Sequence, residues 1–449
     1  MSKESTSQDR KIRSWMEYKL HVVVLFLVII AEWIGMKKFN LGGNVSVVIM
    51  PLLYAMVIGL AFYLAKPITF IGDHESKVAE GLMLLFMTPL LAKLAVSSGQ
   101  ALKLLFDVGP AIILQEFGNL GTIFFALPIA LLLGFKRESI GMTSSICREP
   151  NIGTILDKYG TKSPETRGVL TVYVIGTIIG TVFISLVSSL STSLPFHPYA
   201  LAMASGVGSA SMNAAALAPL TAIFPDMKDT IMAFSGFSNL ISFCFGIYLT
   251  MFIGIPLTEK LYYWLEPKIG RTTSASIPSQ SYEDEDMKNH DLSKEINKIT
   301  WKRVSDWIIL FVIFSFIVTC GNCVSTGRSF YFTFVGMLIL SAMAFASVVL
   351  ERVLPHHISS ILYVSIIGML LSMPWCPLSP IIVTYVNNVE LTSIVTVYLG
   401  YVGISIGRDW DQFKKLGWRG AIVTCFVILG TFIGSATIAQ LVLMGTGAI

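Results

Sequence analysis

Long apolar stretches separated by short polar ones run along almost the whole chain. Several of them approach or reach the roughly 20 apolar residues that a helix needs to cross a bilayer. The alternation typical of barrel strands is absent, and lipid tolerates only helices or closed barrels. The pattern predicts an all-α membrane protein with about eleven spans. We expect these spans at residues 20–36, 46–65, 79–97, 108–134, 168–190, 229–257, 304–322, 329–350, 358–376, 391–407 and 420–444.

One stretch, residues 202–222, is apolar but too small and too polar for an ordinary span, reading AMASGVGSASMNAAALAPLTA. In membrane proteins, lysine and arginine concentrate in short cytoplasmic loops. Here they cluster in residues 1–19, 135–167 and 259–303. Placing these three segments inside requires residues 202–222 to enter and leave the membrane on one face. We therefore predict a re-entrant hairpin, with the N-terminus in the cytoplasm and the C-terminus outside.

Two parts of the chain resemble each other, which indicates an internal repeat. With a re-entrant hairpin between them, an odd number of spans separates the two copies, so the copies are inverted. Inverted repeats with discontinuous membrane segments are typical of secondary transporters. The matched positions are Leu53-Tyr54 with Leu362-Tyr363, Ile58-Gly59 with Ile367-Gly368, and Ala111-Ile112 with Ala421-Ile422.

The predicted organisation has five parts, of which only the linker is a long polar insertion without a hydrophobic face. The parts are a cytoplasmic tail at 1–19, a first transmembrane repeat at 20–134, a central membrane region at 135–258, a cytoplasmic linker at 259–303, and a C-terminal membrane region that contains the second repeat at 304–449.

Composition supports the membrane assignment and excludes several function classes. The chain is 54% hydrophobic and 13% charged, whereas about a quarter of the residues in soluble domains are charged. The net charge of +4 lies in loops, and no basic tract with interleaved aromatics indicates nucleic-acid binding. The six cysteines have no metal or disulfide spacing. No catalytic pair, zinc-ligand helix, dinucleotide loop or haem site occurs, so we expect neither an enzyme nor a bound cofactor.

The hairpin stretch is the first candidate site. Irregular backbone at membrane depth is tolerated where it is buried in protein or lines a cavity, and glycines permit it. Exposed amides and polar side chains there could bind a solute or an ion. The alternative is a helix-packing interface made of small residues. The candidate ligands are Ser205, Gly206, Gly208, Ser209, Ser211 and Asn213.

The second candidate site is the outer half of the span at residues 108–134. Gln115, Asn119 and Thr122 are spaced by three and four residues, so they share one stripe of a helix, with Glu116 beside it. An ionisable residue inside a membrane is costly and is a functional hypothesis by default. We interpret Glu116 as a proton carrier or a cation ligand. The alternatives are a buried cation that pairs with it, or hydration at the outer interface.

Two further segments contain polar residues that could approach the same cavity. In residues 140–160, Arg148 could bind a carboxylate or phosphate, with Glu149 and Asn151 nearby. Asn387 and Asn388 lie near the outer end of the tenth predicted span. A solvated ion pair and an outer loop are the alternatives for these two segments.

Several motifs resemble one bacterial family of polytopic membrane proteins, catalogued as domain of unknown function 3100. They are LQEFGNLGTIFFALPIALLLG, SSICREPNIG, KYGTKSPETRGVL and ASGVGSASMNAA. The resemblance covers most of residues 45–260 and implies a polytopic membrane protein without a known substrate. More distantly, the repeats and the hairpin are similar to the sodium-glutamate and citrate symporter type of fold. The hairpin here lacks the GGHGT pattern of the glutamate symporters.

The sequence thus predicts a secondary active transporter of a bacterial inner membrane. We expect alternating access for a small polar or anionic solute, with Na⁺ or H⁺ as the coupling ion. Its expected partners are the lipid bilayer and the solute, without nucleic acid, and a homodimer is a further hypothesis. The alternative is a non-transporting membrane scaffold or regulatory protein, in which the small residues only pack helices.

Overall fold

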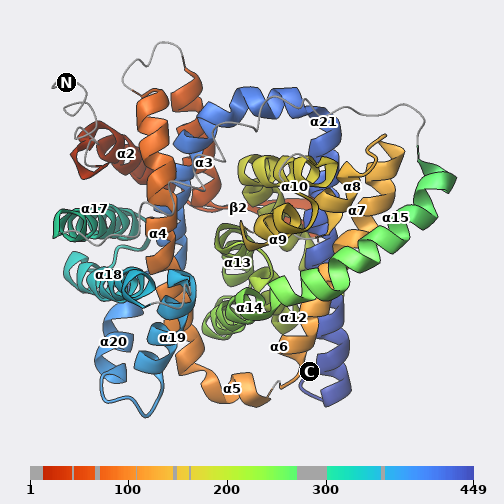
Figure 1. The fold of residues 1–449 in the computed structure, drawn as a ribbon. Helices are drawn as coiled ribbons and strands as arrows, with labels where there is room; N and C mark the ends of the chain where they lie inside the picture. The colour runs from red at the N-terminus through yellow and green to blue at the C-terminus, as the bar shows by residue number, and fades with distance from the viewer. Residues whose placement is uncertain are drawn as a thin grey trace, which may run out of the picture.

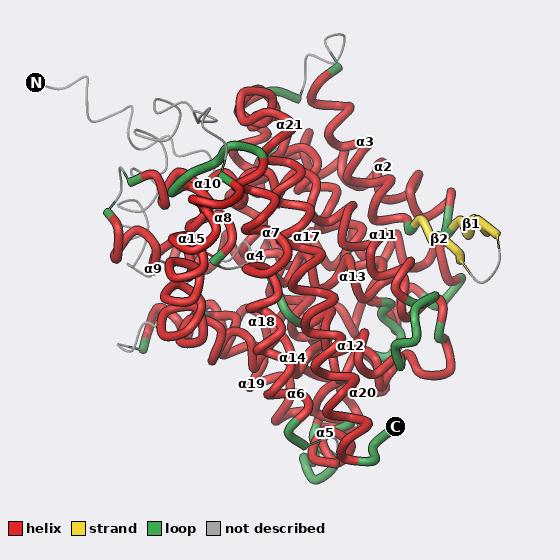
Figure 2. The backbone as a smooth tube through the Cα atoms, turned by 90° about the vertical axis from the view of Figure 1, so that its right-hand side faces the viewer, coloured by secondary structure: helices red, strands yellow, loops and turns green. Residues whose placement is uncertain are grey.

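Nearly all of the chain described by the computed structural model is helical, with a single β-hairpin at one edge (Figure 2). The structure describes residues 14–42, 45–65, 71–107, 109–144, 149–160, 163–270, 301–354 and 359–449. In the N-terminal half the elements are η1 (Ser14–Met16), α2 (Tyr18–Ile34), β1 (Lys37–Gly42), β2 (Val45–Ile49), α3 (Pro51–Leu64), α4 (Asp73–Gln100), α5 (Leu102–Asp107), α6 (Ala111–Leu114), η2 (Gln115–Leu120), α7 (Gly121–Leu132), α8 (Glu138–Thr143), α9 (Glu149–Tyr159) and α10 (Pro164–Ile175).

The later elements include two π-helical turns, η3 and η5, which interrupt long helices. These elements are η3 (Gly176–Gly180), α11 (Thr181–Ser191), α12 (Pro198–Gly206), α13 (Ala210–Ile223), η4 (Pro225–Met227), α14 (Lys228–Leu249), η5 (Thr250–Gly254), α15 (Ile255–Ile269), α17 (Trp301–Thr326), α18 (Phe330–Val353), α19 (Ser360–Ser372), α20 (Ser379–Val386) and α21 (Leu391–Thr446). A non-helical Gly417, with φ of 73°, divides α21 into two parts.

Within the described residues, seven helices are long and apolar enough to cross a membrane. A pair bent by 55°, made of Pro225–Gly246 and Thr250–Ile269, would raise that number to eight. The molecule is therefore a multi-pass helical membrane protein. The seven are Asp73–Gln100, Ala111–Leu132, Pro164–Ser191, Arg303–Thr326, Phe330–Val353, Leu391–Arg408 and Gly417–Thr446. Three further predicted spans form shorter helices, α2, α3 and α19, of 17, 14 and 13 residues, so the number of eleven stays a prediction.

Two segments differ locally from the sequence-based expectation. Residues 46–49, expected to begin a span, form β2, which pairs antiparallel with β1. The β-branched residues of the sequence VSVVI favour a strand there. Helix α15 continues to Ile269, beyond the expected start of the linker at residue 259. Its amphipathic pattern places Tyr262 in a small apolar cluster with residues of α7 and α8, which stabilises the added turns.

Contacts at glycines give the relative directions of α3, α4 and the first part of α21. Met56 packs on Gly403 and Tyr63 packs on Gly407, so α3 and this part of α21 run in the same direction. Helix α4 runs the opposite way. The hydroxyl group of Ser76 donates to the carbonyl of Ser405 near the end of that part, whereas Lys93 donates to the carbonyl of Val386, which precedes it.

Contacts at glycines also give the directions of α19 and the second part of α21. Gly368 packs on Ala92 and Ala95, and Ser372 packs on Gly99, so α19 runs parallel to α4 and opposite to α3. Gly118 of η2 lies directly against Ser435, whereas Phe125 of α7 lies against Gly430, so η2 and α7 run opposite to the second part of α21. The three helical segments with matched sequence positions, α3, α4 and η2–α7, therefore run opposite to α19 and to the first and second parts of α21, respectively.

Helices α12 and α13 form a hairpin that folds back on itself at Val207–Ser209. Gly208 has φ of 123°, a conformation that favours glycine. The rings of Tyr199 and Phe234 pack edge to face, and Met203 accepts a bond from Ser238, so α12 runs in the same direction as α14. Since α13 leads into α14 through the short η4 turn, the two ends of the hairpin lie on the same side of the molecule.

The hairpin lies in the middle of the molecule (Figure 1). Helices α2, α17 and α18 lie on one side of α4, whereas α7 and α15 lie on the far side, beside the second part of α21. Helix α12 contacts both α14 and α21, and α14 contacts α4. The hairpin therefore packs between α11, α14 and α21, and α14 packs in turn on α4.

Candidate functional site

The side chain of Glu116 is buried, at 4% exposure, on the 3₁₀ segment η2. Its carboxylate accepts hydrogen bonds from three side chains: the amides of Gln115 and Asn119, each at 3.0 Å, and the hydroxyl group of Ser242. Glycines at 118 and 121 allow η2 to pack backbone to backbone on Gly430 and Ser435 of α21. The packing therefore holds an acceptor group with several donors inside the protein.

Polar side chains of α14 connect this segment to the hairpin. The amide of Gln115 donates to the hydroxyl oxygen of Ser238 at 2.7 Å, and Ser238 donates to the carbonyl of Met203 at 2.7 Å. The amide of Asn239 donates to the carbonyl of Gly206, also at 2.7 Å. Carbonyls at the hairpin tip, where α12 ends, thus receive bonds from side chains instead of backbone amides.

A second set of bonds holds Asn213, which is fully buried at the start of α13. Its Oδ1 accepts a bond from Ser235 at 2.5 Å, and the hydroxyl oxygens of Ser235 and Ser205 lie 2.8 Å apart. At the tip itself, the hydroxyl groups of Ser209 and Ser211 are 3.1 Å apart, and Ser209 caps α13. Both arms of the hairpin are therefore held by the same face of α14.

Five buried polar atoms around this region have no hydrogen-bond partner within the described part of the chain. Leaving such a group unpaired costs about 1–3 kcal/mol, so a cluster of them indicates a place built for a ligand or ordered water. The atoms are Gln115 Oε1, Asn213 Nδ2, Ser185 Oγ, Thr431 Oγ1 and Ser435 Oγ.

A small cavity of about 10 Å³ lies beside the tip of the hairpin. Val207 and Met212 of the hairpin line it together with Thr431 of α21. That volume is close to the space occupied by a single water molecule. Ile184, Ile428 and Phe432 complete the wall.

The structure brings most of the sequence-predicted residues together and leaves a few apart. Gln115, Glu116, Asn119, Ser205, Gly206 and Asn213 belong to the bonded network described above. Thr122 is buried, and its hydroxyl group donates to the carbonyl of Thr143 at 2.7 Å, which links α7 to α8. Asn151 is buried on α9, outside this network. Arg148 and the side chain of Glu149 lie outside the described residues.

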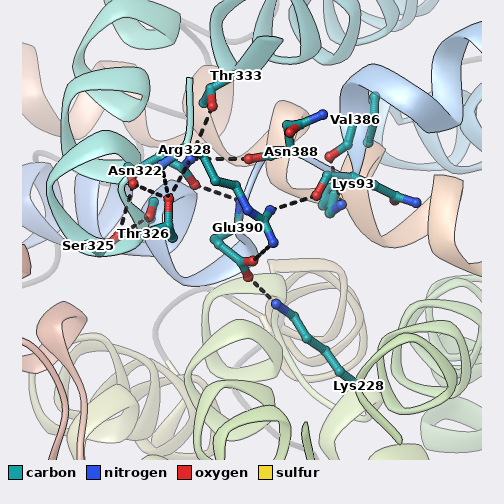
Figure 3. Close-up of polar contacts among 12 residues, drawn as sticks. Lys93, Lys228, Asn322, Ser325, Thr326, Arg328, Thr333, Val386, Asn388 and Glu390 are labelled. Carbon is teal, nitrogen blue, oxygen red and sulfur yellow. Dashed lines mark hydrogen bonds and ion pairs between the residues drawn. The ribbon is translucent and has the colours of Figure 1, made fainter. Parts of the chain in front are cut away.

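Asn387 and Asn388 contribute backbone carbonyls to an ion-pair network around Glu390, and Figure 3 shows this network around Asn388 and Glu390. Glu390 forms ion pairs with Lys228 and, at 2.9 Å, with Arg328. Arg328 also donates to the carbonyl of Asn387 at 2.8 Å, and Asn322 donates to that of Asn388 at 3.1 Å. The network joins α14, the α17–α18 connection and the start of α21.

Two groups of site residues escaped the sequence analysis. On α14, the polar residues 235, 238, 239 and 242 follow the spacing of three, four and seven that marks one face of a helix. This polar stripe in the sequence SGFSNLIS indicates a buried polar face of α14. Lys93, buried at 3% exposure with its Nζ 2.9 Å from the carbonyl of Val386, is a lone cation in an apolar span. Such a residue is a functional hypothesis in its own right.

Outside the candidate spans, two groups are perturbed by burial. His197 caps α12 by accepting the backbone N–H of Tyr199 on Nδ1 at 3.2 Å, and partial burial lowers the pKa of His197. On α9, burial raises the pKa of Tyr159, and its hydrogen bond to Glu259 at 2.6 Å raises it further. That bond fixes α9 to α15.

Comparisons with known proteins give one family and no relative of known function. No curated protein matches the chain, and no solved structure matches it. The family model described as protein of unknown function (DUF3100) matches residues 29–264. The matched region is more than half of the chain and contains η2, the α12–α13 hairpin and the polar face of α14. The chain therefore belongs to the DUF3100 family.

Proposed function

We propose that the protein is a secondary active transporter that moves a small polar or anionic solute by alternating access, coupled to Na⁺ or H⁺. The observation that carries the proposal is the set of unpaired buried atoms on η2, the hairpin, α11 and α21. Buried polar groups are costly, so a protein that only packs helices would fill these positions with apolar side chains.

The opposite directions of matched helices support an inverted repeat. Gly59 and Gly368 occupy matched positions in the sequence, and each packs on the second helix of the other repeat, Gly59 on Gly400 and Gly368 on Ala92. This reciprocal contact is what a two-fold axis between inverted repeats would produce. In secondary transporters of this architecture, the solute site lies near the bilayer midplane, where discontinuous helices meet.

The hairpin is the discontinuous element in this proposal. Its two ends lie on one side and its tip lies in the middle of the molecule, as expected of a segment that enters and leaves the membrane on one face. With basic loops inside, that face is the outside of a bacterial inner membrane, with the N-terminus in the cytoplasm and the C-terminus outside. The distant likeness to the glutamate and citrate symporter fold remains a hypothesis.

The chemistry of the site suits a small solute with both donors and acceptors. Asn213 Nδ2 and the three unpaired hydroxyl groups can donate to the solute, and Gln115 Oε1 can accept from it. The N-terminus of α13 lies at the hairpin tip, and its free N–H groups and dipole favour a negative group there. Glu116, next to Gln115, supplies a negative charge that would hold a cation at the site.

A deletion strain and reconstituted vesicles test this proposal for a solute that is still unidentified. Metabolite profiles of the deletion strain and its parent would identify a small polar compound whose level differs. Purified protein in proteoliposomes should then take up that compound when an inward Na⁺ or H⁺ gradient is imposed. An unchanged profile, together with vesicles that show no uptake of any compound tested, would favour the scaffold alternative.

A further inference from the structure

A second buried carboxyl group lies at a different place in the fold, on α2. Glu32 is 3% exposed and lies in the last turn of that helix. It packs against Gly321 of α17 and faces the first turns of α21. Helices α2 and α17 lie on the side of α4 away from α7 (Figure 1), so Glu32 belongs to a different cluster from Glu116.

Uncharged side chains lie next to the Glu32 carboxyl group within the described residues. They are the hydroxyl groups of Thr396, Ser325 and Ser393. One carboxyl oxygen, Oε1, is buried without a hydrogen-bond partner, and no ion pair holds Glu32 within the described residues. An ionised carboxylate is strongly disfavoured in such surroundings.

The charged and titratable groups of the neighbouring elements do not neutralise a carboxylate at Glu32. Among the described residues, Glu390, which precedes α21, acts on Glu32 electrostatically, and its charge is negative. Glu390 is itself held by Lys228 and Arg328. Helix α17 also contains the free thiols Cys320 and Cys323, which carry no positive charge.

The direction of one hydrogen bond favours a protonated Glu32. A threonine hydroxyl group has a single hydrogen, and that of Thr396 donates to the carbonyl of Thr392 at 2.8 Å. While it donates there, Thr396 offers the Glu32 carboxyl group an acceptor and no hydrogen. Glu116 shows the opposite arrangement, since three donors point at its carboxylate.

A sodium site would need more oxygen ligands than the surroundings of Glu32 offer. Cations of this kind bind in transporters where unwound backbone exposes carbonyls. Helix α21 is regular at residues 393 and 396, so its carbonyls at this level serve helix hydrogen bonds. The first turn of α21 also presents free N–H groups, which would stabilise the carboxylate once the proton leaves.

We propose that Glu32 is a proton-binding site, separate from the site around Glu116, and that the proton it exchanges is the coupling ion. The coupling role rests on the proposed transport function, whereas the proton-binding site does not. Proton binding is therefore measured on the purified protein by infrared spectroscopy, which detects the carbonyl stretch of a protonated carboxyl group.

The infrared experiment compares wild type, Glu32→Gln and the control Glu351→Gln, which removes a carboxylate near the end of α18. Wild type and the control should show a protonated-carboxyl band at neutral pH that disappears on alkaline titration, and Glu32→Gln should lack it. A band that persists in Glu32→Gln, or its absence from wild type, would overturn the proposal. Loss of the band on adding NaCl at constant pH would also overturn it, in favour of a sodium site.

Two additions keep the test decisive. If Glu32→Gln does not fold, Thr396→Val removes the acceptor and should shift the midpoint of the same titration. In vesicles, Glu32→Gln should lose uptake driven by a proton gradient but keep solute exchange at equal pH, and an unimpaired gradient response would contradict the coupling role. Absence of uptake by wild type would refute the proposed transport function and leave the infrared result standing.

Discussion

The amide nitrogen of Gln115 lies 2.7 Å from the hydroxyl oxygen of Ser238. This bond joins a 3₁₀ segment of the first predicted repeat to the helix that follows the hairpin. Ser238 donates its own hydrogen to the carbonyl of Met203 of α12. Any movement of the hairpin relative to η2 must therefore break one of these two bonds or move α14 as well. The site and the moving element of the proposed transporter are thus coupled through α14.

Replacement of Gly118 should disrupt the site through packing alone. In Gly118→Ala, the new methyl group would overlap the backbone of Ser435, and overpacking of this kind costs about 1–3 kcal/mol. Gly81→Ala is the matched control, because nothing lies within 4 Å of a Cβ atom there. Thermal unfolding of the purified proteins should show a lower Tm for Gly118→Ala only; equal Tm values would argue against the close crossing of η2 and α21.

Thr431→Val should separate stability from function. The Thr431 hydroxyl group is buried without a hydrogen-bond partner among the described residues, so its removal should leave the Tm unchanged or raise it. Loss of a ligand contact should nevertheless weaken solute uptake severalfold. Thr437→Val, which removes an exposed hydroxyl group further along the same helix, should change neither quantity. A normal uptake in Thr431→Val would remove that residue from the site.

The pH dependence of stability should include a contribution from His197. Its pKa is lowered by burial, so the neutral form is favoured in the folded protein, and its contribution to stability is complete above the ordinary histidine value. It is lost as the pH falls from about 6.5 towards the folded pKa. His197→Asn keeps a capping acceptor but does not titrate. The Tm of this variant should fall less than that of wild type over the same range.

The location of the hairpin ends can be measured by cysteine labelling. In a variant whose six native cysteines are replaced by serine, single cysteines at Ser193 and Asp229 bracket the hairpin. An impermeant thiol reagent applied to intact spheroplasts should label both. Labelling of position 229 only after the membrane is opened would mean that residues 202–222 cross it, which would make the repeats parallel.

Local spacing allowed the sequence to predict part of the site. Gln115, Glu116 and Asn119 are close in sequence, so their proximity follows from helix geometry. The glycine-rich break at 206–208 was likewise visible, because glycine there permits a conformation that other residues avoid. The partners on α14 and α21 lie more than a hundred residues away, and only the packing of long helices brings them to Glu116.

Helix length was harder to predict than helix position. Residues 46–49 are as apolar as a span, but hydropathy alone does not distinguish a strand from the first turn of a helix. Helix α3 begins at Pro51, a residue suited to the first turn of a helix, so it is shorter than the apolar stretch that contains it. Buried ionisable groups such as Lys93 stand out in an apolar stretch, but their partners do not.

The most direct test of the central claim is solute uptake by proteoliposomes that contain wild type, Glu116→Gln, Asn213→Ala or the control Glu266→Gln. Glutamine leaves one donor to residue 116 unpaired, and alanine removes both the bond to Ser235 and the free Nδ2 group. Both variants should lose uptake at least about tenfold, which corresponds to about 1.4 kcal/mol, at unchanged protein level, whereas the control should keep it. Full uptake by Glu116→Gln and Asn213→Ala would contradict the assignment of the site.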